Sequence, residues 1–360
     1  MKIVVFVNTP AQAHFLKNII RGLSTRGHSI TVLSRDYGET LDVLTELGII
    51  HQTYSRPKKS KISKTLSFPS DVLNAYKLLS KSKFDLVFGF GIIETYTGLL
   101  LRAPVLIFND SEPMVNNFSF SMQFLLFMPF IEAIITPSAF RQDLGKKHIR
   151  VDSYKELAYL HPNYFKPNDD IFQLLGMAKG ERYAILRFNA FDAVHDAGVT
   201  GFTDQDKIRL VTELEKSMKV LISSESKLPG TISDRVMKIP KNRIHDALYF
   251  SQLLVTDTQT MATEAALLGV PTVRCNKFVG INDMGNFTEL EKKYGLLYNF
   301  LNQNEAIDMA LSLASKKNIK AEWQFKKTAL ITEKTDITQF MIKFIEKLRN
   351  SSNDSDKLKR

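Results

Sequence analysis

Polar side chains that follow short apolar runs are the first candidates for chemistry in this chain. The clearest group lies between Asp257 and Pro271, in the segment DTQTMATEAALLGVP. We expect the hydroxyls of Thr258 and Thr260 to cap a helix that ends at Gly269. The free backbone N–H groups of such a helix start, together with the neighbouring hydroxyls and the Gln259 side chain, favour binding of a phosphate group.

Glu264 belongs to the same segment, and we expect it in the first turn of the helix. A carboxylate adds little to phosphate binding, but it can accept hydrogen bonds from both hydroxyls of a ribose. The combination of hydroxyl loop and carboxylate therefore favours a nucleotide over phosphate alone.

Three more groups of polar residues follow apolar runs in the second half of the chain. The run RYAILRF ends with Arg187 and is followed by His195. The run KVLISS ends with Ser224 and continues into Glu225, and His245 opens the next helical stretch. If the apolar runs are parallel strands, these side chains gather at the carboxyl edge of one sheet, where ligands of such sheets bind.

The first half contributes three candidates for acid and base chemistry. His14 lies near the start of the first predicted helix, where the helix N-terminus favours the neutral imidazole and hence a general base. Asp110 and Glu112 follow the run PVLIF and form a plausible acid and base pair. The alternatives are a structural histidine and an Asx turn. Two carboxylates without a third ligand do not specify a metal site.

Glycines at 89, 91 and 98 follow another apolar run, FDLVFGF. Their spacing differs from the G-x-G-x-x-G pattern of dinucleotide-binding sites, because Glu94 stands where that pattern requires glycine. We therefore exclude a nicotinamide site here and expect close backbone packing at this turn.

The elements that must position these residues alternate regularly between strand and helix. Apolar runs such as KIVVFV, SITVLSR and KVLISS read as strands, and stretches such as AHFLKNIIRGLSTRG and DQDKIRLVTELEKSM read as helices. Such alternation predicts an α/β fold with two doubly wound, Rossmann-like parallel sheets. We expect the two domains to face a cleft with the carboxyl ends of their strands.

The predicted domains are residues 1–155, on the acceptor side, and residues 165–330, which bind the donor. The polar passage from Pro137 to Asp170 reads as the crossing between them. Residues 331–349 form an amphipathic helix that returns to the first domain, with an apolar face of Phe340, Ile342, Phe344, Ile345 and Leu348. Residues 350–360 form a polar tail.

Composition limits the class of protein. The 360 residues are 44% hydrophobic and 24% charged, as in folded globular proteins, and the single cysteine, Cys275, excludes an internal disulfide framework. The net charge of +10 favours anionic partners, although no nucleic-acid-binding motif is present. We expect a cytoplasmic protein.

The most apolar stretch runs from Phe118 to Ile135, and polar residues and Pro129 interrupt it. It is too short and too interrupted for a spanning helix, which needs about 20 apolar residues. Phe118–Phe130 is either core or a surface that contacts the inner face of a membrane.

These features together resemble the GT-B superfamily, which holds nucleotide-sugar glycosyltransferases and the non-hydrolysing UDP-N-acetylglucosamine 2-epimerases. The resemblance rests on the two doubly wound halves, the block TDTQTMATEAALLGVPTV and the C-terminal helix. More segments, including YKELAYLHPNYFKP, ISSESKLP and EAALLGVPTVRCN, are similar to an uncharacterised prokaryotic family of GT-B-like proteins. On the superfamily pattern, Thr258, Gln259 and Thr260 meet the donor diphosphate and Glu264 holds the ribose.

The resemblance implies three functions. The first is a metal-independent glycosyltransferase that needs no cofactor and moves a sugar from a nucleotide-diphosphate donor to a glycan or lipid-linked acceptor, with Arg187 at the diphosphate and His14 or Asp110 as base. The second is a nucleotide-sugar epimerase with Asp110 and Glu112 as acid and base. Its histidine–arginine loop is replaced here by RFNAFDAVHD, which leaves Arg187 and His195 for the phosphate side. The third is a non-catalytic nucleotide-sugar or glycan-binding protein. Fold alone does not decide among them.

Overall fold

The computed structural model describes residues 1–56, 68–112, 124–189, 201–224, 227–280 and 283–357, with only the backbone from 349 onward. The chain folds into two compact units. Unit 1 comprises Met1–Tyr164 and Thr335–Arg360, and unit 2 comprises Phe165–Lys334.

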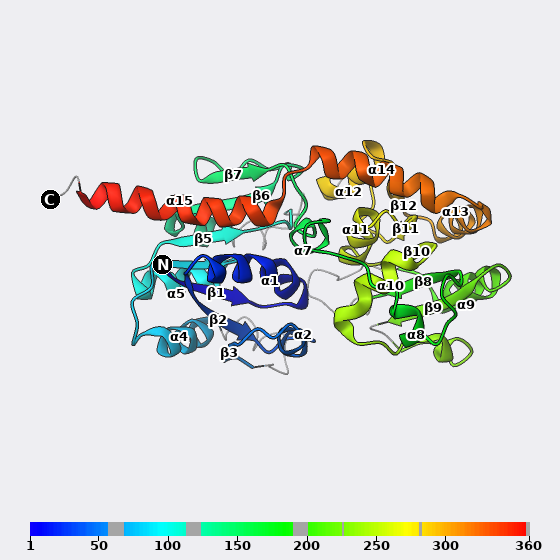
Figure 1. Cartoon of the computed structure of the whole chain (residues 1–360), viewed down its shortest axis with the longest axis horizontal. Coiled ribbons are helices and arrows are strands. Elements are labelled where there is room, and N and C mark those ends of the chain that lie inside the picture. The colour runs from blue at the N-terminus through cyan, green and yellow to red at the C-terminus, as the bar shows by residue number, and fades with distance from the viewer. Residues whose placement is uncertain (57–67, 113–123, 190–200, 225–226, 281–282, 358–360) are drawn as a thin grey trace. The chain divides into compact units, whose positions relative to one another are not determined.

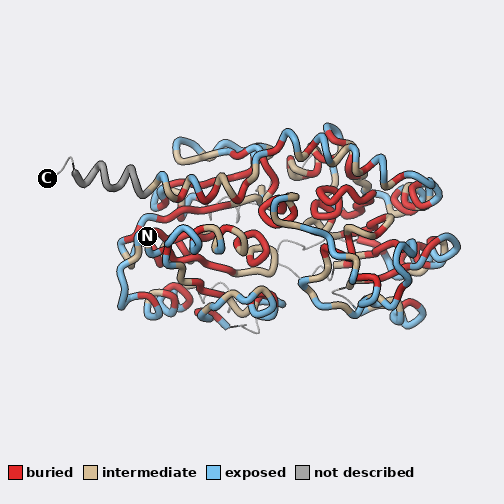
Figure 2. Tube along the Cα trace, in the orientation of Figure 1, coloured by how far each residue is buried: buried red, intermediate tan, exposed pale blue. Residues whose placement is uncertain are grey.

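Unit 1 is built on a parallel sheet whose described strands have the order β3-β2-β1-β4-β5-β6-β7. Most residues of these strands are apolar and buried, except in the edge strands β3 and β7 (Figure 2). The bounds are β1 (Lys2–Val7), β2 (Ser29–Arg35), β3 (Gln52–Ser55), β4 (Leu86–Gly89), β5 (Val105–Phe108), β6 (Ala133–Pro137) and β7 (His148–Val151).

Most helices of unit 1 lie between successive strands, as a parallel sheet requires, whereas α7 and α15 follow the last strand. In Figure 1 they are drawn in blue to green, and the final helix in red. They are α1 (Pro10–Thr25), α2 (Thr40–Glu46), α4 (Phe68–Leu79), α5 (Ile92–Leu101), the 3-10 helix η1 (Met128–Phe130), α7 (Leu157–Leu160) and α15 (Ile337–Lys357).

The C-terminal helix α15 belongs to unit 1 and packs against α1 and α7 (Figure 1). Its apolar face buries Ile337, Met341, Ile342 and Ile345. The expected return of the chain to its first domain is confirmed, and the physical reason is an amphipathic helix whose apolar stripe needs a partner.

Unit 2 is built on a second parallel sheet, whose described strands have the order β12-β11-β10-β8-β9. The strands are β8 (Tyr183–Phe188), β9 (Lys219–Ser224), β10 (Leu253–Thr256), β11 (Thr272–Cys275) and β12 (Tyr298–Phe300). The helices are α8 (Ile171–Leu174), α9 (Asp204–Leu214), η3 (Ser233–Arg235), η4 (Lys241–Arg243), α10 (Ile244–Phe250), α11 (Thr260–Leu267), α12 (Gly285–Lys292), α13 (Gln303–Ser315) and α14 (Ile319–Glu333). Two doubly wound α/β units were predicted, and this fold class is confirmed.

The polar passage that the sequence analysis assigned to a domain crossing holds regular structure of unit 1. Strand β7 and helix α7 lie within it, and β7 pairs with β6 in parallel, with Ile134 opposite His148. The strand is an edge strand of mixed polarity, HIRV, so its sequence lacks the apolar run of a central strand.

The apolar stretch from Phe118 to Phe130 is described only from residue 124 onward. Phe124 and Phe127 are buried in the core of unit 1, whereas the side chains of Leu125, Leu126 and Phe130 are exposed. Within the described part of the chain, no helix is long and apolar enough to cross a membrane.

Candidate functional site

The strand order of the unit 2 sheet reverses between β8 and β10. These strands are neighbours, with Arg187 opposite Thr256, yet the chain leaves β8 towards β9 and β10 towards β11. Helices leaving neighbouring strands on opposite faces open a crevice at their carboxyl ends, which is where ligands bind in open α/β sheets. Most of the donor-binding residues predicted for this unit lie at this edge.

Arg187 places a cation at this edge, at the fifth residue of β8. Its Nη1 atom donates a hydrogen bond to Ser223 Oγ at 2.8 Å, and Ser224 is the next and last residue of β9. Arg187 is half-buried, and the hydrogen bond to Ser223 of β9 positions its guanidinium. The two other predicted residues of these loops, His195 and Glu225, lie outside the described residues.

Asp257 follows β10 directly and is buried. One carboxylate oxygen, Oδ1, accepts a hydrogen bond of 2.7 Å from the Asn189 backbone N–H. Burial raises the pKa of Asp257 to about 7, against the opposing effects of that N–H group and of the charges on Lys207 and Arg187. Its carbonyl oxygen accepts a hydrogen bond from Asn276 Nδ2 at 3.0 Å. Asp257 thus ties the loop after β10 to the loops after β8 and β11.

Helix α11 starts without a side-chain cap, which corrects the expectation for Thr258 and Thr260. The N-cap residue is Gln259, in a helical conformation, and α11 begins at Thr260. Thr258 turns back to the strand, where its N–H donates to Thr256 Oγ1 at 2.9 Å and the two hydroxyls lie 2.8 Å apart. The first backbone N–H groups of α11 therefore have no capping hydroxyl and suit an anion.

Glu264 lies one turn further into α11 than expected, at its fifth residue. It forms a buried pair with His245 of α10, with 2.9 Å between His245 Nε2 and Glu264 Oε1. The ring of Phe165 packs edge-on against His245, with 6.4 Å between ring centroids. Two predicted residues that are 19 positions apart are thus brought into direct contact.

The strand order of the unit 1 sheet also reverses, between β1 and β4. Asn8 follows β1 and Glu94 lies in the first turn of α5, after β4. Asn8 Nδ2 donates to Glu94 Oε1 at 2.6 Å, and Tyr54 Oη donates to Asn8 Oδ1 at 2.6 Å. Both ends of the Asn8 amide are fixed by these two bonds.

Glu94 was not among the predicted site residues. It stands three residues after Gly91, the N-cap of α5, which is the position of the glutamate in a capping box. Burial raises the pKa of Glu94, against the opposing effects of the Asn8 amide and of backbone groups of residues 90, 91 and 94. An acidic residue at the third helical position after an apolar strand is the sequence signal that could have found it.

His14 is the fifth residue of α1 and is buried. Its ring lies 5.4 Å from the ring of Tyr159, centroid to centroid, so it packs against the α7 segment. Thr9 caps α1 by accepting a hydrogen bond from the Gln12 N–H. The imidazole therefore sits one turn inside the helix and not at its first residue.

Asp110 and Glu112 have separate partners. Asp110 forms an ion pair with Lys155, and Glu112 Oε1 accepts a hydrogen bond from the Arg141 N–H at 2.7 Å. An Asx turn is present as well, because Asn109 Oδ1 accepts from the Ser111 N–H at 2.7 Å. Glu112 is thereby tied to the segment after β6, and Asp110 to the segment before α7. In the described residues, no three His, Cys, Asp or Glu side chains are close enough to hold a metal ion.

Comparison with solved structures identifies the fold. Spinosyn rhamnosyltransferase SpnG, complexed with spinosyn aglycone, has a TM-score of 0.61 at 15% identity, covering 96% of this chain and 100% of that chain. S. aureus MnaA in a co-structure with UDP has a TM-score of 0.65 at 11% identity, covering 97% of each chain. UDP-GlcNAc 2-epimerase from Neisseria meningitidis, bound to UDP-GlcNAc, has a TM-score of 0.58 at 13% identity, covering 92% of this chain and 98% of that chain.

At these identities the similarity shows the fold alone, and the fold is GT-B. A search of the curated proteins finds no match. The model of the family described as "Protein of unknown function (DUF354)" matches residues 1–347, and the chain therefore belongs to this family.

Proposed function

We propose that this protein is a metal-independent glycosyltransferase that uses a nucleotide-diphosphate sugar as donor. The observation that carries the proposal is the arrangement at the carboxyl edge of unit 2, where Arg187 stands beside the β8–β10 crevice and α11 starts without a side-chain cap. Both features offer positive charge or N–H donors to a diphosphate. The solved structures of similar fold include complexes with UDP and with thymidine diphosphate, which supports this ligand class.

The chemistry follows from where charge develops. When the sugar leaves the donor, negative charge grows on the diphosphate, and fixed donors stabilise that charge without a metal ion. Glu264 would accept hydrogen bonds from the ribose hydroxyls, and the contact with His245 would hold its carboxylate in place. His14 or Asp110 of unit 1 would take the proton of the acceptor hydroxyl.

The acceptor would be a glycan or a lipid-linked acceptor, handled in the cytoplasm at the inner face of the membrane. Unit 1 offers an apolar surface, the α5 patch, made by the exposed residues Leu99, Leu100, Leu125, Leu126 and Phe130. The segment of residues 124–130 lies against α5, because Tyr96 Oη donates to the Leu126 carbonyl at 3.1 Å and its ring lies 5.8 Å from that of Phe130. A patch of this kind suits peripheral contact with lipid.

The donor site is tested by thermal unfolding against a panel of nucleoside diphosphates and their sugar conjugates. A ligand at 100 times its Kd should stabilise the protein by about 2.7 kcal/mol. Arg187→Ala and Glu264→Ala should each abolish the shift, whereas the control Arg209→Ala, on an exposed arginine of the same unit, should retain it. A panel without any shift would contradict the donor site.

The reaction is tested with the stabilising donor and candidate acceptors, with and without a chelator. Transfer that persists in chelator and falls in His14→Ala or Asp110→Asn supports the proposal. An epimerised donor formed without acceptor would favour the epimerase. Donor binding without turnover, unchanged in both variants, would favour a binding protein.

Membrane contact is tested by sedimentation with anionic vesicles. Replacing Leu99 and Leu125 together by Asp should reduce the bound fraction, whereas the same change at Leu301, an exposed leucine of unit 2, should not. Equal sedimentation of both variants would exclude the α5 patch as the contact surface.

A further inference from the structure

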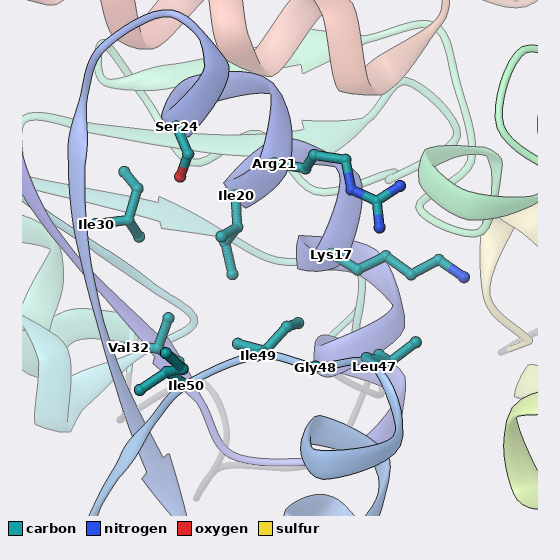
Figure 3. Close-up of a pocket in the computed structure, with 10 residues that line it drawn as sticks. All are labelled: Lys17, Ile20, Arg21, Ser24, Ile30, Val32, Leu47, Gly48, Ile49 and Ile50. Carbon is teal, nitrogen blue, oxygen red and sulfur yellow. The ribbon is translucent and has the colours of Figure 1, made fainter.

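Unit 1 contains a pocket of about 310 Å³, and no predicted site residue that the structure describes lines it (Figure 3). It lies between α1, β2 and the connection from α2 to β3. The lining residues are Lys17, Ile20, Arg21, Ser24, Ile30, Val32, Leu47, Gly48, Ile49 and Ile50. Ligand pockets start at about this volume, at roughly 300 Å³.

The pocket is remote in the fold from the carboxyl edge of the sheet. Ile30 is the second residue of β2, Ile49 and Ile50 precede β3, and three of the four α1 residues come from the second half of that helix. These positions belong to the amino-terminal side of the strands. A ligand here would therefore occupy a site separate from Asn8, Glu94 and Asp110, which follow strand ends.

The walls of the pocket are aliphatic. Ile30 and Val32 are two residues apart and so face the same side of the strand, towards α1. Ile50 is 93% exposed, and Ile20 and Ile49 are only half-buried. Among the residues that the structure describes, no aromatic and no acidic one lines the pocket. Nucleobases stack on aromatic groups, and sugars need several polar partners, so the lining fits neither.

One end of the pocket is cationic. Lys17 and Arg21 are four residues apart and therefore share a face of α1. Figure 3 shows both side chains extending to the same side of the aliphatic residues. The Lys17 ammonium lies 5.7 Å from the centroid of the Tyr159 ring, and Arg21 is exposed. Two cations beside an aliphatic wall match a ligand with an anionic head and a hydrocarbon body.

We propose that this pocket binds a single short aliphatic chain that ends in a phosphate, of the isoprenyl monophosphate class. The hydrocarbon would cover the isoleucine walls, which removes exposed apolar surface from water. The phosphate would lie between the Lys17 ammonium and the Arg21 guanidinium, where charge-assisted hydrogen bonds are available. This site goes beyond the proposed transfer reaction and depends on neither its donor residues nor its catalytic residues.

The test is calorimetric titration of the full-length protein with geranyl monophosphate, and with geraniol and inorganic phosphate as half-ligands. We expect saturable binding of geranyl monophosphate and at least tenfold weaker binding of each half-ligand. Ile50→Asp, which alters an exposed wall residue, and Arg21→Glu, which reverses the exposed charge, should each weaken binding at least tenfold. The matched controls Phe325→Asp and Lys317→Glu, both at exposed positions of unit 2, should bind as the wild type does.

Five results would overturn the proposal. Four of them are no binding of geranyl monophosphate, equal binding of geraniol, equal binding of inorganic phosphate, and affinity unchanged in both pocket variants. Association with anionic vesicles but not with monomeric geranyl monophosphate would also overturn it, because the surface would then contact a membrane. Since the donor test uses Arg187 and Glu264 variants, either site can fail while the other stands.

Discussion

Buried polar side chains define the candidate site at the residue scale. Asp257, Glu264 and His245 of unit 2 and Glu94 of unit 1 are all buried, and each has a specific hydrogen-bond partner. Burying such groups costs free energy unless they are hydrogen-bonded, so their positions are closely fixed. These residues would therefore hold a ligand-binding edge rigid, while Arg187, the start of α11 and the ribose-binding carboxylate of Glu264 face the ligand.

Asp257 makes the stability of the protein dependent on pH. Its pKa is raised to about 7 in the folded state, so folding favours the protonated form. The pKa of an aspartate in the unfolded chain is near 4, and below that pH the stabilisation is complete. As the pH rises from about 4 to about 7, the stabilisation is lost at about 1.4 kcal/mol for each pH unit. Asp257→Asn should lose less stability than the wild type between pH 4 and 7, measured by urea unfolding without ligand. Parallel pH profiles of the two proteins would contradict this assignment.

Gly201 is needed because no side chain fits beside Asp257. A Cβ atom at Gly201 would lie 2.2 Å from Asp257 Oδ2. Gly201→Ala should therefore destabilise the protein by about 1–3 kcal/mol, the usual range for overpacking. The control is Gly230→Ala, because a Cβ atom there would meet nothing within 4 Å. Equal urea midpoints for the two variants would show that the loop yields without cost.

At the scale of the element, a buried ion pair joins β11 to the residues before α12. Both carboxylate oxygens of Asp283 accept hydrogen bonds from Arg274, at 2.7 and 3.0 Å, and the guanidinium lies 3.6 Å from the Phe287 ring centroid. Arg274 is fully buried. The pair therefore anchors the start of α12 to the sheet.

Removing one partner of this pair should be costly. Asp283→Ala leaves a buried guanidinium without its carboxylate and should destabilise unit 2 by about 3–5 kcal/mol. Asp308→Ala breaks the exposed pair with Arg209 in the same unit and should cost less than about 1 kcal/mol. Chemical denaturation followed by the fluorescence of Trp323, the single tryptophan, measures both. Similar costs for the two variants would mean that water reaches Arg274.

Central, buried strands could be predicted from the sequence, whereas the edge strands β3 and β7 could not. Strands β1, β8 and β10 are central and read as apolar runs, so the sequence places them correctly. Strands β3 and β7 lie at the edges of the sheet and consist of QTYS and HIRV, which carry no such run. Pairing with a neighbour, not local preference, makes these segments strands.

The candidate site could be predicted only in part for a related reason. The ends of apolar strands can be recognised in the sequence, so Arg187 and the segment from Asp257 to Thr260 could be located there. The contact between His245 and Glu264 joins two helices, and the bonds of Asn8 to Tyr54 and Glu94 join the end of β1 to β3 and to the first turn of α5. Such contacts depend on the order of strands in the sheet, which sequence patterns alone do not specify.

At the scale of the whole molecule, the two units offer separate spectroscopic probes. Trp323 is buried in unit 2, whereas α15 completes unit 1. Ile345→Asp places a charge in the buried face of α15 and should destabilise unit 1. We expect a lower urea midpoint by circular dichroism but an unchanged midpoint by Trp323 fluorescence. The exposed change Lys347→Asp serves as control, and a joint shift of both signals would show that the units unfold together.

The return of the chain to unit 1 also has a consequence for synthesis on the ribosome. Unit 2 is inserted between residues 164 and 335, so the surface of α1 and α7 that α15 covers is complete before its cover exists. At about 5–20 residues per second, roughly 10–40 s pass between the emergence of α7 and that of the C-terminus. During this interval the nascent unit 1 exposes an apolar seam, which is the surface of α1 and α7 that α15 later covers. A chaperone that holds this seam would act on every copy of the protein, and would be released by the arrival of α15 itself.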